Sequence, residues 1–172
     1  ASGENAERAA ARCKKPVQLV RGGATRAESA RNGVAAAHGA LVAVHDAARP
    51  FVSGEVIAAV LKAAARCGAA APAVPVKDTI KVAAADGAVL ETPDRSTLRA
   101  VQTPQVFEAE LLKAALQSAL ENNVPVTDDC SAVERLGKEV YLTAGDPENI
   151  KITRPLDLRL AEAILAERRK QA

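Results

Sequence analysis

The sequence contains very few aromatic residues: no tryptophan, one tyrosine and two phenylalanines among 172 residues. Hydrophobic residues nevertheless make up 48% of the chain and charged residues 26%, which is typical of a globular protein and excludes a disordered chain. The core must therefore be built from alanine, valine, leucine and isoleucine. A chain of this length forms one domain of ordinary size, which we expect to span residues 1–172.

The chain also has little net charge, at +2 overall. A basic stripe with interleaved aromatic residues is absent from the sequence, so we expect no nucleic-acid partner. No apolar run reaches the roughly 18 residues that a membrane-spanning helix needs. The polar start ASGENAER does not resemble a targeting peptide. These features favour a cytoplasmic protein with no membrane partner.

Cysteine is scarce as well, with Cys13, Cys67 and Cys130 at wide spacing. An odd number of scattered cysteines argues against a disulfide framework and against a metal cluster. We therefore expect reduced thiols and no metal-ligating residues.

The most informative stretch that is present is LVAVHDAARPFVS, residues 41–53. Its first five residues predict a buried central strand of a parallel sheet, because they show no polar alternation. Asp46 and Arg49 follow at the position where open α/β sheets bind ligands. They could form a simple loop ion pair. However, Ala47 and Ala48 leave backbone amides approachable, and a carboxylate beside a guanidinium suits a hydroxylated, phosphorylated ligand.

Hydrophobic patterns and cap signals predict alternating strands and helices along the rest of the chain. The expected strands are residues 16–20, 41–45, 69–76, 98–103, 139–143 and 149–153. The expected helices are residues 5–13, 25–38, 54–67, 108–122, a short one after 127–129, and an amphipathic one that begins near Pro155. This order predicts an α/β fold with a mostly parallel sheet and helices on both faces.

Gly22 and Gly23 lie at a predicted turn between a strand and a helix that TRAE (25–28) would open as a capping box. Such a turn exposes backbone amides and carbonyls to a ligand, and Arg26 and Ser29 would point toward the same place. A glycine pair is a weak signal by itself, since any tight turn can use it.

The alternation of strands and helices is interrupted beyond residue 76 by a hairpin, in which residues 79–82 and 88–92 flank the turn Ala85-Asp86-Gly87. No helix follows to cover this hairpin, so it needs another surface to pack on. A second copy of the chain is the simplest supplier. We therefore interpret approximately residues 76–100 as a dimerisation arm.

Six motifs taken together resemble the 2-C-methyl-D-erythritol 4-phosphate cytidylyltransferase family, in that family's order and across nearly the whole chain. They are GGATRAES (22–29), VHDAARPF (44–51), PVKDTIK (75–81), TPDRSTLRAVQTPQVF (92–107), TDDCSAVE (127–134) and NIKITRPLDL (149–158). The resemblance implies a Rossmann-like nucleotidyltransferase. Such an enzyme transfers CMP from CTP to methylerythritol phosphate and releases pyrophosphate in the non-mevalonate route to isoprenoids.

The resemblance also implies roles for individual residues. Those near the cytosine would be Gly22, Gly23, Ala24 and Ser29, and those near the ribose Asp46 and Ala47. The residues facing the sugar phosphate would be Arg49, Thr127 and Lys151, the last also near the α-phosphate. The residues that the arm of a homodimer brings to the partner's site would be Thr79 and Arg95. The catalytic residues would be Lys151 and Arg95.

The implied chemistry suits these residue types. An attacking phosphate is already anionic, so catalysis reduces to holding two polyanions in line and neutralising their charge. Lysine, arginine and Mg²⁺ carried by the nucleotide phosphates can do this. Histidine is not required, and we expect His45 to be structural and His38 to be a helix-end cation. Lys81 and Asp128 stay open between site and scaffold.

The family's first strand and its Gly-rich loop, whose arginine and lysine bind the triphosphate, have no counterpart in this sequence. Either an N-terminal part precedes Ala1 in the complete protein, or the chain is a truncated form that cannot hold a triphosphate. We favour the first, because a sheet without its first strands would expose unpaired edges. This chain by itself could then be inactive.

Two alternative functions stay open. One is another polyol-phosphate cytidylyltransferase, such as a ribitol-phosphate enzyme, although the arm sequence TPDRSTLRAVQTPQ argues against it. The other is a catalytically dead module that binds a nucleotide or dimerises.

Overall fold

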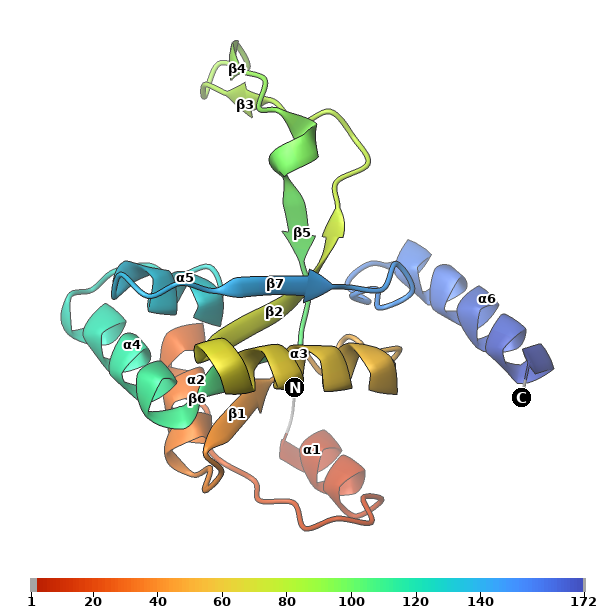
Figure 1. Ribbon diagram of the computed structural model, residues 1–172. Coiled ribbons are helices and arrows are strands. Elements are labelled where there is room, and N and C mark those ends of the chain that lie inside the picture. Colours follow the sequence, from red (N-terminus) through yellow and green to blue (C-terminus); the bar gives the residue numbers. More distant parts are fainter. Residues whose placement is uncertain (1–2, 172) are drawn as a thin grey trace.

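The computed structural model describes residues 3–171 as a central sheet with helices on both faces and a projecting arm (Figure 1). The helices are α1 (Gly3–Ala10), α2 (Arg26–Ala35), α3 (Gly54–Cys67), the 3-10 turn η1 (Arg95–Thr97), α4 (Ala109–Glu121), α5 (Asp129–Arg135) and α6 (Pro155–Gln171). The strands are β1 (Leu41–Val44), β2 (Ala69–Pro75), β3 (Val82–Ala83), β4 (Val89–Glu91), β5 (Arg99–Val101), β6 (Gln105–Glu108) and β7 (Tyr141–Ala144). The α/β fold class is confirmed. Residues 1, 2 and 172 of the predicted domain lie outside this description. None of the helices in residues 3–171 combines the length and the apolar composition of a membrane-spanning segment.

Local cap signals explain where two of the helices begin and end. Thr25 forms the predicted capping box of α2, and the Ser53 side chain caps α3. Gly68 ends α3 with a φ of 83°, a left-handed conformation that glycine adopts without strain. The extent of α3 is therefore as predicted, whereas α2 ends at Ala35 rather than near His38.

In the five-stranded sheet, β6 and β5 pair one after the other with β2, β6 also pairs with β1, and β7 pairs with the other edge of β2. Strands β1, β2 and β7 run in one direction, but β6 lies between β1 and β2 and runs against both. Among the described strands only the β2–β7 pairing is parallel. The prediction of a mostly parallel sheet is therefore wrong, because most neighbouring strands of this sheet pair in antiparallel fashion. The prediction of a central 41–45 strand is wrong too, because within residues 3–171 β1 pairs with β6 alone.

Two predicted strands are not formed. Residues 16–20 are irregular, and Val17, Leu19 and Val20 are 48%, 52% and 42% exposed, so this segment has no sheet against which to pack. Residues 149–153 are irregular as well. Strand β6 is not predicted by the sequence pattern, because Pro104 marks the end of the expected returning strand, whereas the sheet resumes directly after it.

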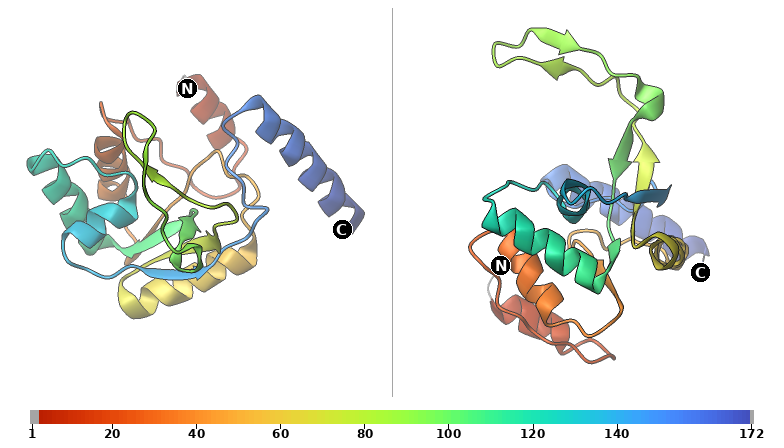
Figure 2. Two further views of the ribbon diagram at one scale, coloured as in Figure 1. Left: turned by 90° about the horizontal axis from the view of Figure 1, so that it is seen from above. Right: turned by 60° about the vertical axis from the view of Figure 1, so that its left-hand side comes forward.

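Helices lie on both faces of the sheet (Figure 2), and alternating side chains of β2 and β6 build a core on each face. Ala69, Ala71 and Phe107 pack in a cluster with residues of α2, α4 and α5. Ala70 and Val106 pack against α3 on the opposite face. The two faces are therefore covered as predicted, by a core with few aromatic residues.

The predicted hairpin is formed by β3 and β4, at the tip of an arm that β2 leads into and β5 leads out of (Figure 1). Its paired strands are shorter than predicted, and Gly87 in its turn has a φ of 91°. Val82, Val89 and Leu90 on this hairpin are 42%, 58% and 67% exposed. A single chain thus leaves the apolar side chains of the arm uncovered.

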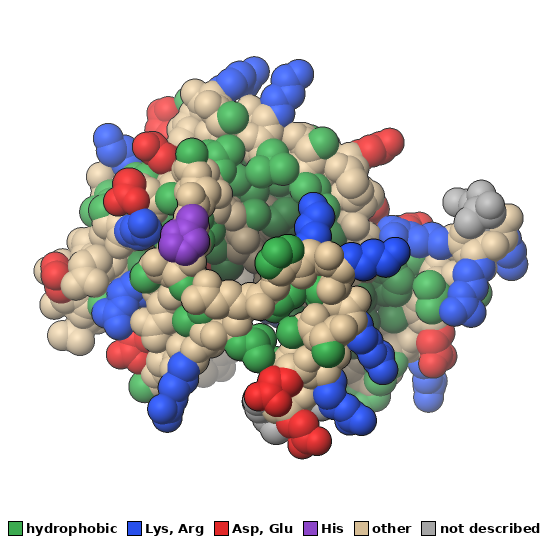
Figure 3. Space-filling model, turned by 90° about the horizontal axis from the view of Figure 1, so that it is seen from below, with side chains coloured by type: hydrophobic (Ala, Val, Ile, Leu, Met, Phe, Trp, Pro, Cys, Tyr) green, Lys and Arg blue, Asp and Glu red, His purple; other side chains and the backbone are tan. Residues whose placement is uncertain are grey.

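Helix α6 extends away from the sheet (Figures 1 and 2), and its Leu156 and Leu158 are 70% and 55% exposed. Arg168 fastens it to the body. The guanidinium donates to the Phe51 carbonyl and to Glu148 Oε2, both at 3.0 Å, and lies 5.3 Å from the centre of the Phe51 ring. On the face seen in Figure 3, apolar side chains gather in a hollow that is bordered by lysine and arginine side chains.

Candidate active site

A cavity of about 160 Å³ collects side chains from loops that are far apart in the sequence. It is lined by Arg26, Asp46, Arg49, Val101, Gln102, Thr103, Gln105, Thr127, Asp128 and Lys151. Of the predicted substrate-binding residues, the structure therefore brings together Asp46, Arg49, Thr127 and Lys151. Ala47 follows Asp46 but is exposed and outside this lining.

Asp46 is the anionic centre of the cavity. Its Oδ2 lies 2.9 Å from Lys151 Nζ and 3.8 Å from Arg49 Nε. Burial acts to raise the pKa of Asp46, but the hydrogen bond and charge of Lys151, with the charges of Arg49 and Arg26, hold that pKa below its ordinary value of 3.8. Asp46 is therefore ionised at neutral pH, with two cations beside it.

Arg49 has a buried hydrogen-bond donor without a partner among the described residues. This donor is Nε, whereas Nη1 donates to the Asn149 carbonyl at 2.7 Å. Burial lowers the pKa of Arg49, and the charge of Asp46 opposes this shift. A half-buried guanidinium with an unpaired N–H is suited to an anionic oxygen of a ligand.

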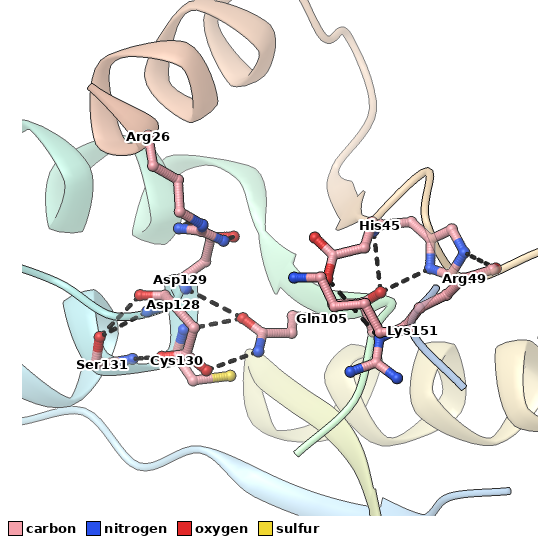
Figure 4. A network of polar contacts seen from close by, with 11 residues as sticks. Arg26, His45, Arg49, Gln105, Asp128, Asp129, Cys130, Ser131 and Lys151 are labelled. Carbon is pink, nitrogen blue, oxygen red and sulfur yellow. Dashed lines mark hydrogen bonds and ion pairs between the residues drawn. The ribbon is translucent and has the colours of Figure 1, made fainter. Parts of the chain in front are cut away.

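His45 connects the ends of the loop that carries these charges (Figure 4). Its Nε2 lies 3.0 Å from the Arg49 carbonyl, which can only accept, so Nε2 carries the proton. Nδ1 then accepts from the Thr103 hydroxyl at 2.9 Å, and the same hydroxyl oxygen accepts the Asp46 N–H at 3.0 Å. Both ring nitrogens are thus occupied, as expected of a structural imidazole.

Arg26 and Asp129 form a bidentate ion pair at the opposite end of the cavity (Figure 4). Arg26 Nη1 and Nη2 donate to the two carboxylate oxygens at 3.0 and 2.7 Å, and the Asp129 side chain is only 1% exposed. This hydrogen bond raises the pKa of Arg26 although burial acts against it. Arg26 therefore joins the start of α2 to the start of α5 instead of pointing toward the glycine turn.

The predicted cytosine-binding residues Gly22, Gly23, Ala24 and Ser29 lie outside the cavity lining, in the turn before α2 and its first residues. The turn is fastened to α2, because the Gly23 N–H donates to Ser29 Oγ at 3.0 Å and the Ala24 N–H to Glu28 Oε2 at 2.6 Å. The expectation that both amides are free for a ligand is therefore wrong. A Cβ on Gly23 would lie 2.8 Å from Glu28 Oε2, so the fold itself requires glycine here.

The predicted arm residues lie elsewhere in the same chain. Arg95 Nη1 donates to the Lys77 carbonyl at 2.8 Å, and Arg95 lines a cavity of about 630 Å³ with Lys77 and Arg99. Thr79 is exposed in the segment before β3. Within a single chain, Arg95 and Lys151 therefore line two different cavities.

The cavity residues that were not predicted as site residues include three buried polar ones: Gln102, Thr103 and Gln105. They are 6%, 8% and 3% exposed, in a segment that continues into the buried Val106 and Phe107. No signal in the sequence identifies them, because polar residues beside an apolar pair do not show whether they are buried. Within residues 3–171 no group of three His, Cys, Asp or Glu side chains is placed to hold a metal ion.

Comparisons with known proteins show similarity to one family of enzymes. A family model described as "IspD: 2-C-methyl-D-erythritol 4-phosphate cytidylyltransferase" matches residues 2–167. A relative with that enzyme name from Symbiobacterium thermophilum is 48% identical over 159 residues, which is 91% of this chain and 67% of the relative. Another from Caldanaerobacter subterraneus is 51% identical over 153 residues, or 88% of this chain and 67% of the relative. The chain thus spans about two thirds of the length of these relatives.

Solved structures extend this likeness to three dimensions. The 4-diphosphocytidyl-2C-methyl-D-erythritol synthase from Anaerococcus prevotii superposes with a TM-score of 0.88 at 31% identity, over 95% of this chain and 77% of the other. The 2-C-methyl-D-erythritol 4-phosphate cytidylyltransferase from Thermus thermophilus gives a TM-score of 0.80 at 40% identity, over 90% and 78%. The chain therefore belongs to the 2-C-methyl-D-erythritol 4-phosphate cytidylyltransferase family.

Proposed function

We propose that the cavity of Asp46, Arg49, Thr127 and Lys151 is where this cytidylyltransferase joins CMP from CTP to methylerythritol phosphate and releases pyrophosphate. The observation that carries the proposal is the convergence of these four side chains from three separate loops. Asp46, Arg49 and Lys151 together carry one net positive charge, which favours phosphate groups.

In the proposed reaction, a phosphate oxygen of methylerythritol phosphate attacks the α-phosphorus of CTP and pyrophosphate leaves. The attacking group is already anionic, so charge neutralisation and alignment are what the protein must supply. Lys151 is 47% exposed and is held by Asp46, so its ammonium group can contact both the incoming phosphate and the α-phosphate. The Nε–H of Arg49 and the Thr127 hydroxyl would bind the acceptor phosphate.

The nucleotide would lie along Asp46 and Ala47 toward the turn of Gly22, Gly23 and Ala24. The Asp46 carboxylate suits the ribose hydroxyls, which can donate to it. Since Ser29 and Glu28 already accept the amides of the turn, the backbone carbonyls of the turn are the groups we expect to read the cytosine amino group.

Mg²⁺ would enter with the triphosphate rather than through a site made of protein ligands alone. Phosphate oxygens of the nucleotide, completed by water, are a donor set that Mg²⁺ accepts, so the ion would need no protein ligand. When bound, the ion would neutralise charge on the transferring phosphoryl group.

The site would be completed by the arm of a second subunit in a homodimer, which would supply Thr79 and Arg95. Two observations support this. Arg95 lines a different cavity from Lys151 in its own chain, and the hairpin exposes Val89 and Leu90, which a partner could cover.

The function is tested with the complete protein, CTP and Mg²⁺, by following the cytidylylated product and pyrophosphate. Methylerythritol phosphate should be converted and ribitol 5-phosphate should not. Arg49→Gln should raise the KM for the acceptor by about tenfold, as expected for the loss of one charge-assisted hydrogen bond. The control Arg159→Gln changes an exposed arginine of α6 and should leave the KM unchanged. Failure to form product, or preference for ribitol phosphate, would contradict the proposal.

A further inference from the structure

The segment Gln102–Gln105 forms a bulge in the central sheet. Residues 69 and 70 of β2 pair with β6, and residues 73–75 pair with β5, so residues 71 and 72 stand opposite the four residues 102–105. The Gln102 N–H donates to the Pro72 carbonyl at 2.8 Å, which anchors the bulge at one end. Bulges of this kind redirect side chains next to functional sites.

Gln105 directs all of its side-chain hydrogen bonds to the start of α5, directly after Thr127 (Figure 4). Its Oε1 accepts the N–H groups of Asp129 and Cys130 at 3.1 and 3.2 Å. Its Nε2 donates to Asp128 Oδ2 at 2.7 Å. Because Gln105 is 3% exposed, water cannot replace these bonds.

Gln102 makes the equivalent contacts to the loop that carries Lys151. Its Nε2 donates to the carbonyls of Asp146 and Asn149 at 2.8 and 3.4 Å. Its Oε1 accepts the Asp146 N–H at 3.2 Å and Asn149 Nδ2 at 3.4 Å. The Asn149 carbonyl also accepts from Arg49, and Lys151 follows two residues later. Through Asn149, Gln102 is therefore linked to both Arg49 and Lys151.

We propose that Gln102 and Gln105 are positioning residues for the reaction. Gln105 sets the place of Thr127, and Gln102 sets the place of Lys151. Thr127 and Lys151 themselves lie in irregular segments, so the buried amide bonds of Gln105 to the start of α5 and of Gln102 to residues 146–149 fix where these two side chains lie. This inference rests on the proposed function, which assigns Thr127 and Lys151 to the acceptor phosphate.

The Gln105–Asp128 hydrogen bond can be broken and restored by exchanging donor and acceptor. Gln105→Glu places a carboxylate oxygen against Asp128, and Asp128→Asn places an amide N–H₂ against the N–H₂ of Gln105, so each single change breaks the bond. The double variant pairs a glutamate acceptor with an asparagine donor and restores it. In Asp128→Asn the side-chain oxygen that remains can still accept the Ser131 N–H that caps α5.

We expect each single variant to raise the KM for methylerythritol phosphate by about tenfold, with the KM for CTP nearly unchanged, because only the Thr127 loop is displaced. The double variant should recover most of the wild-type value. Gln102→Glu, which places an oxygen against two carbonyls, should instead lower kcat through Lys151. If Gln105→Glu does not fold, Asp128→Asn and the double variant carry the same test.

Gln117→Glu is the matched control. Gln117 Nε2 donates to Glu121 Oε1 at the same 2.7 Å, but this pair is exposed on α4. The substitution therefore makes the same chemical change away from the cavity and should leave both kinetic constants unchanged.

The positioning role is overturned if the single variants melt at lower temperature yet keep wild-type kinetic constants, or if the folded double variant is as impaired as either single one. Failure of the proposed function is a separate result, because it would appear as an absence of cytidylyl transfer in the wild-type protein.

Discussion

Lys151 Nζ and Asp46 Oδ2 lie 2.9 Å apart, although the two residues come from opposite halves of the chain. The lysine side chain is 47% exposed and the aspartate side chain 31% exposed, so water screens the pair. Such a pair contributes about 0.5 kcal/mol to stability. Its main consequence is the placement of a mobile ammonium group beside the cavity.

Lys151→Ala should lower kcat by about a hundredfold, since a positioned cation that stabilises charge in the transition state is worth that much or more. The free energy of unfolding should change by less than about 1 kcal/mol. Turnover and denaturant unfolding of the same preparation measure the two effects. Lys113→Ala is the control, because Lys113 forms a 2.8 Å pair with Glu110 on the surface of α4. A folded Lys151→Ala enzyme as active as the control would exclude the phosphate role.

Asp46 should make stability depend on pH in the acid range. Its pKa is lower in the folded protein than its ordinary value of 3.8, so its stabilisation is complete above that value and is lost as the pH falls through the folded pKa. Asp46→Asn should therefore be less stable than wild type near neutral pH, and the difference should shrink only when the pH falls below the ordinary value of 3.8 and through the lower pKa of the folded protein.

Unfolding in denaturant across this pH range measures the difference. Asp78→Asn, at an exposed position of the arm, is the control and should show a difference that does not vary with pH. A constant difference for Asp46→Asn as well would show that the carboxylate is not stabilised by Lys151 and Arg49 in the folded state.

Gly23→Ala should disturb the turn before α2 as well as any nucleotide that binds to it. The added Cβ would meet Glu28, whose carboxylate accepts the N–H groups of Ala24 and Thr25. We expect faster amide exchange at Ala24 and weaker CTP binding. Gly33→Ala in the helix that follows meets no atom within 4 Å and should stabilise the protein by about 0.5 kcal/mol. Equal exchange rates in the two variants would contradict this account of the turn.

Arg26→Ala should be strongly destabilising, because it leaves the Asp129 carboxylate without its cation in a position that is only 1% exposed. Removing one partner of such a pair costs about 3 kcal/mol. Denaturant unfolding measures the loss. Lys170→Ala, which removes an exposed pair with Glu167 on α6, should cost less than about 1 kcal/mol. If Arg26→Ala and Lys170→Ala lowered the free energy of unfolding by similar amounts, the burial of Asp129 would not be what makes the Arg26–Asp129 pair strong.

Features set by neighbouring residues could be predicted from the sequence. Ser53 and Gly68 delimit α3, and Gly87 turns the hairpin, because caps and turns depend on a few adjacent residues. The mixed sheet could not be predicted in this way. It depends on the pairing of Ala69 with Phe107, and nothing near either residue specifies that partner.

The residues of the site also differ in whether they could be predicted from the sequence. Asp46 and Arg49 could be found because they follow a recognisable strand. Gln105 and Asp129 could not, since a polar side chain in a sequence does not reveal whether it is buried or what it contacts. The Arg26–Asp129 pair joins residues 103 positions apart, so it follows from tertiary packing alone.

The central claim is that each active site combines Lys151 of one subunit with Arg95 of another, and mixing two inactive variants tests it most directly. Arg95→Ala and Lys151→Ala are made separately in the complete protein, shown to be nearly inactive, and then unfolded and refolded together. Half of the dimers formed at random are mixed, and one of the two sites in each is intact, so about a quarter of the wild-type activity should return. If mass spectrometry shows mixed dimers but the mixture stays as inactive as its parents, Arg95 does not act across the interface and the shared site is contradicted.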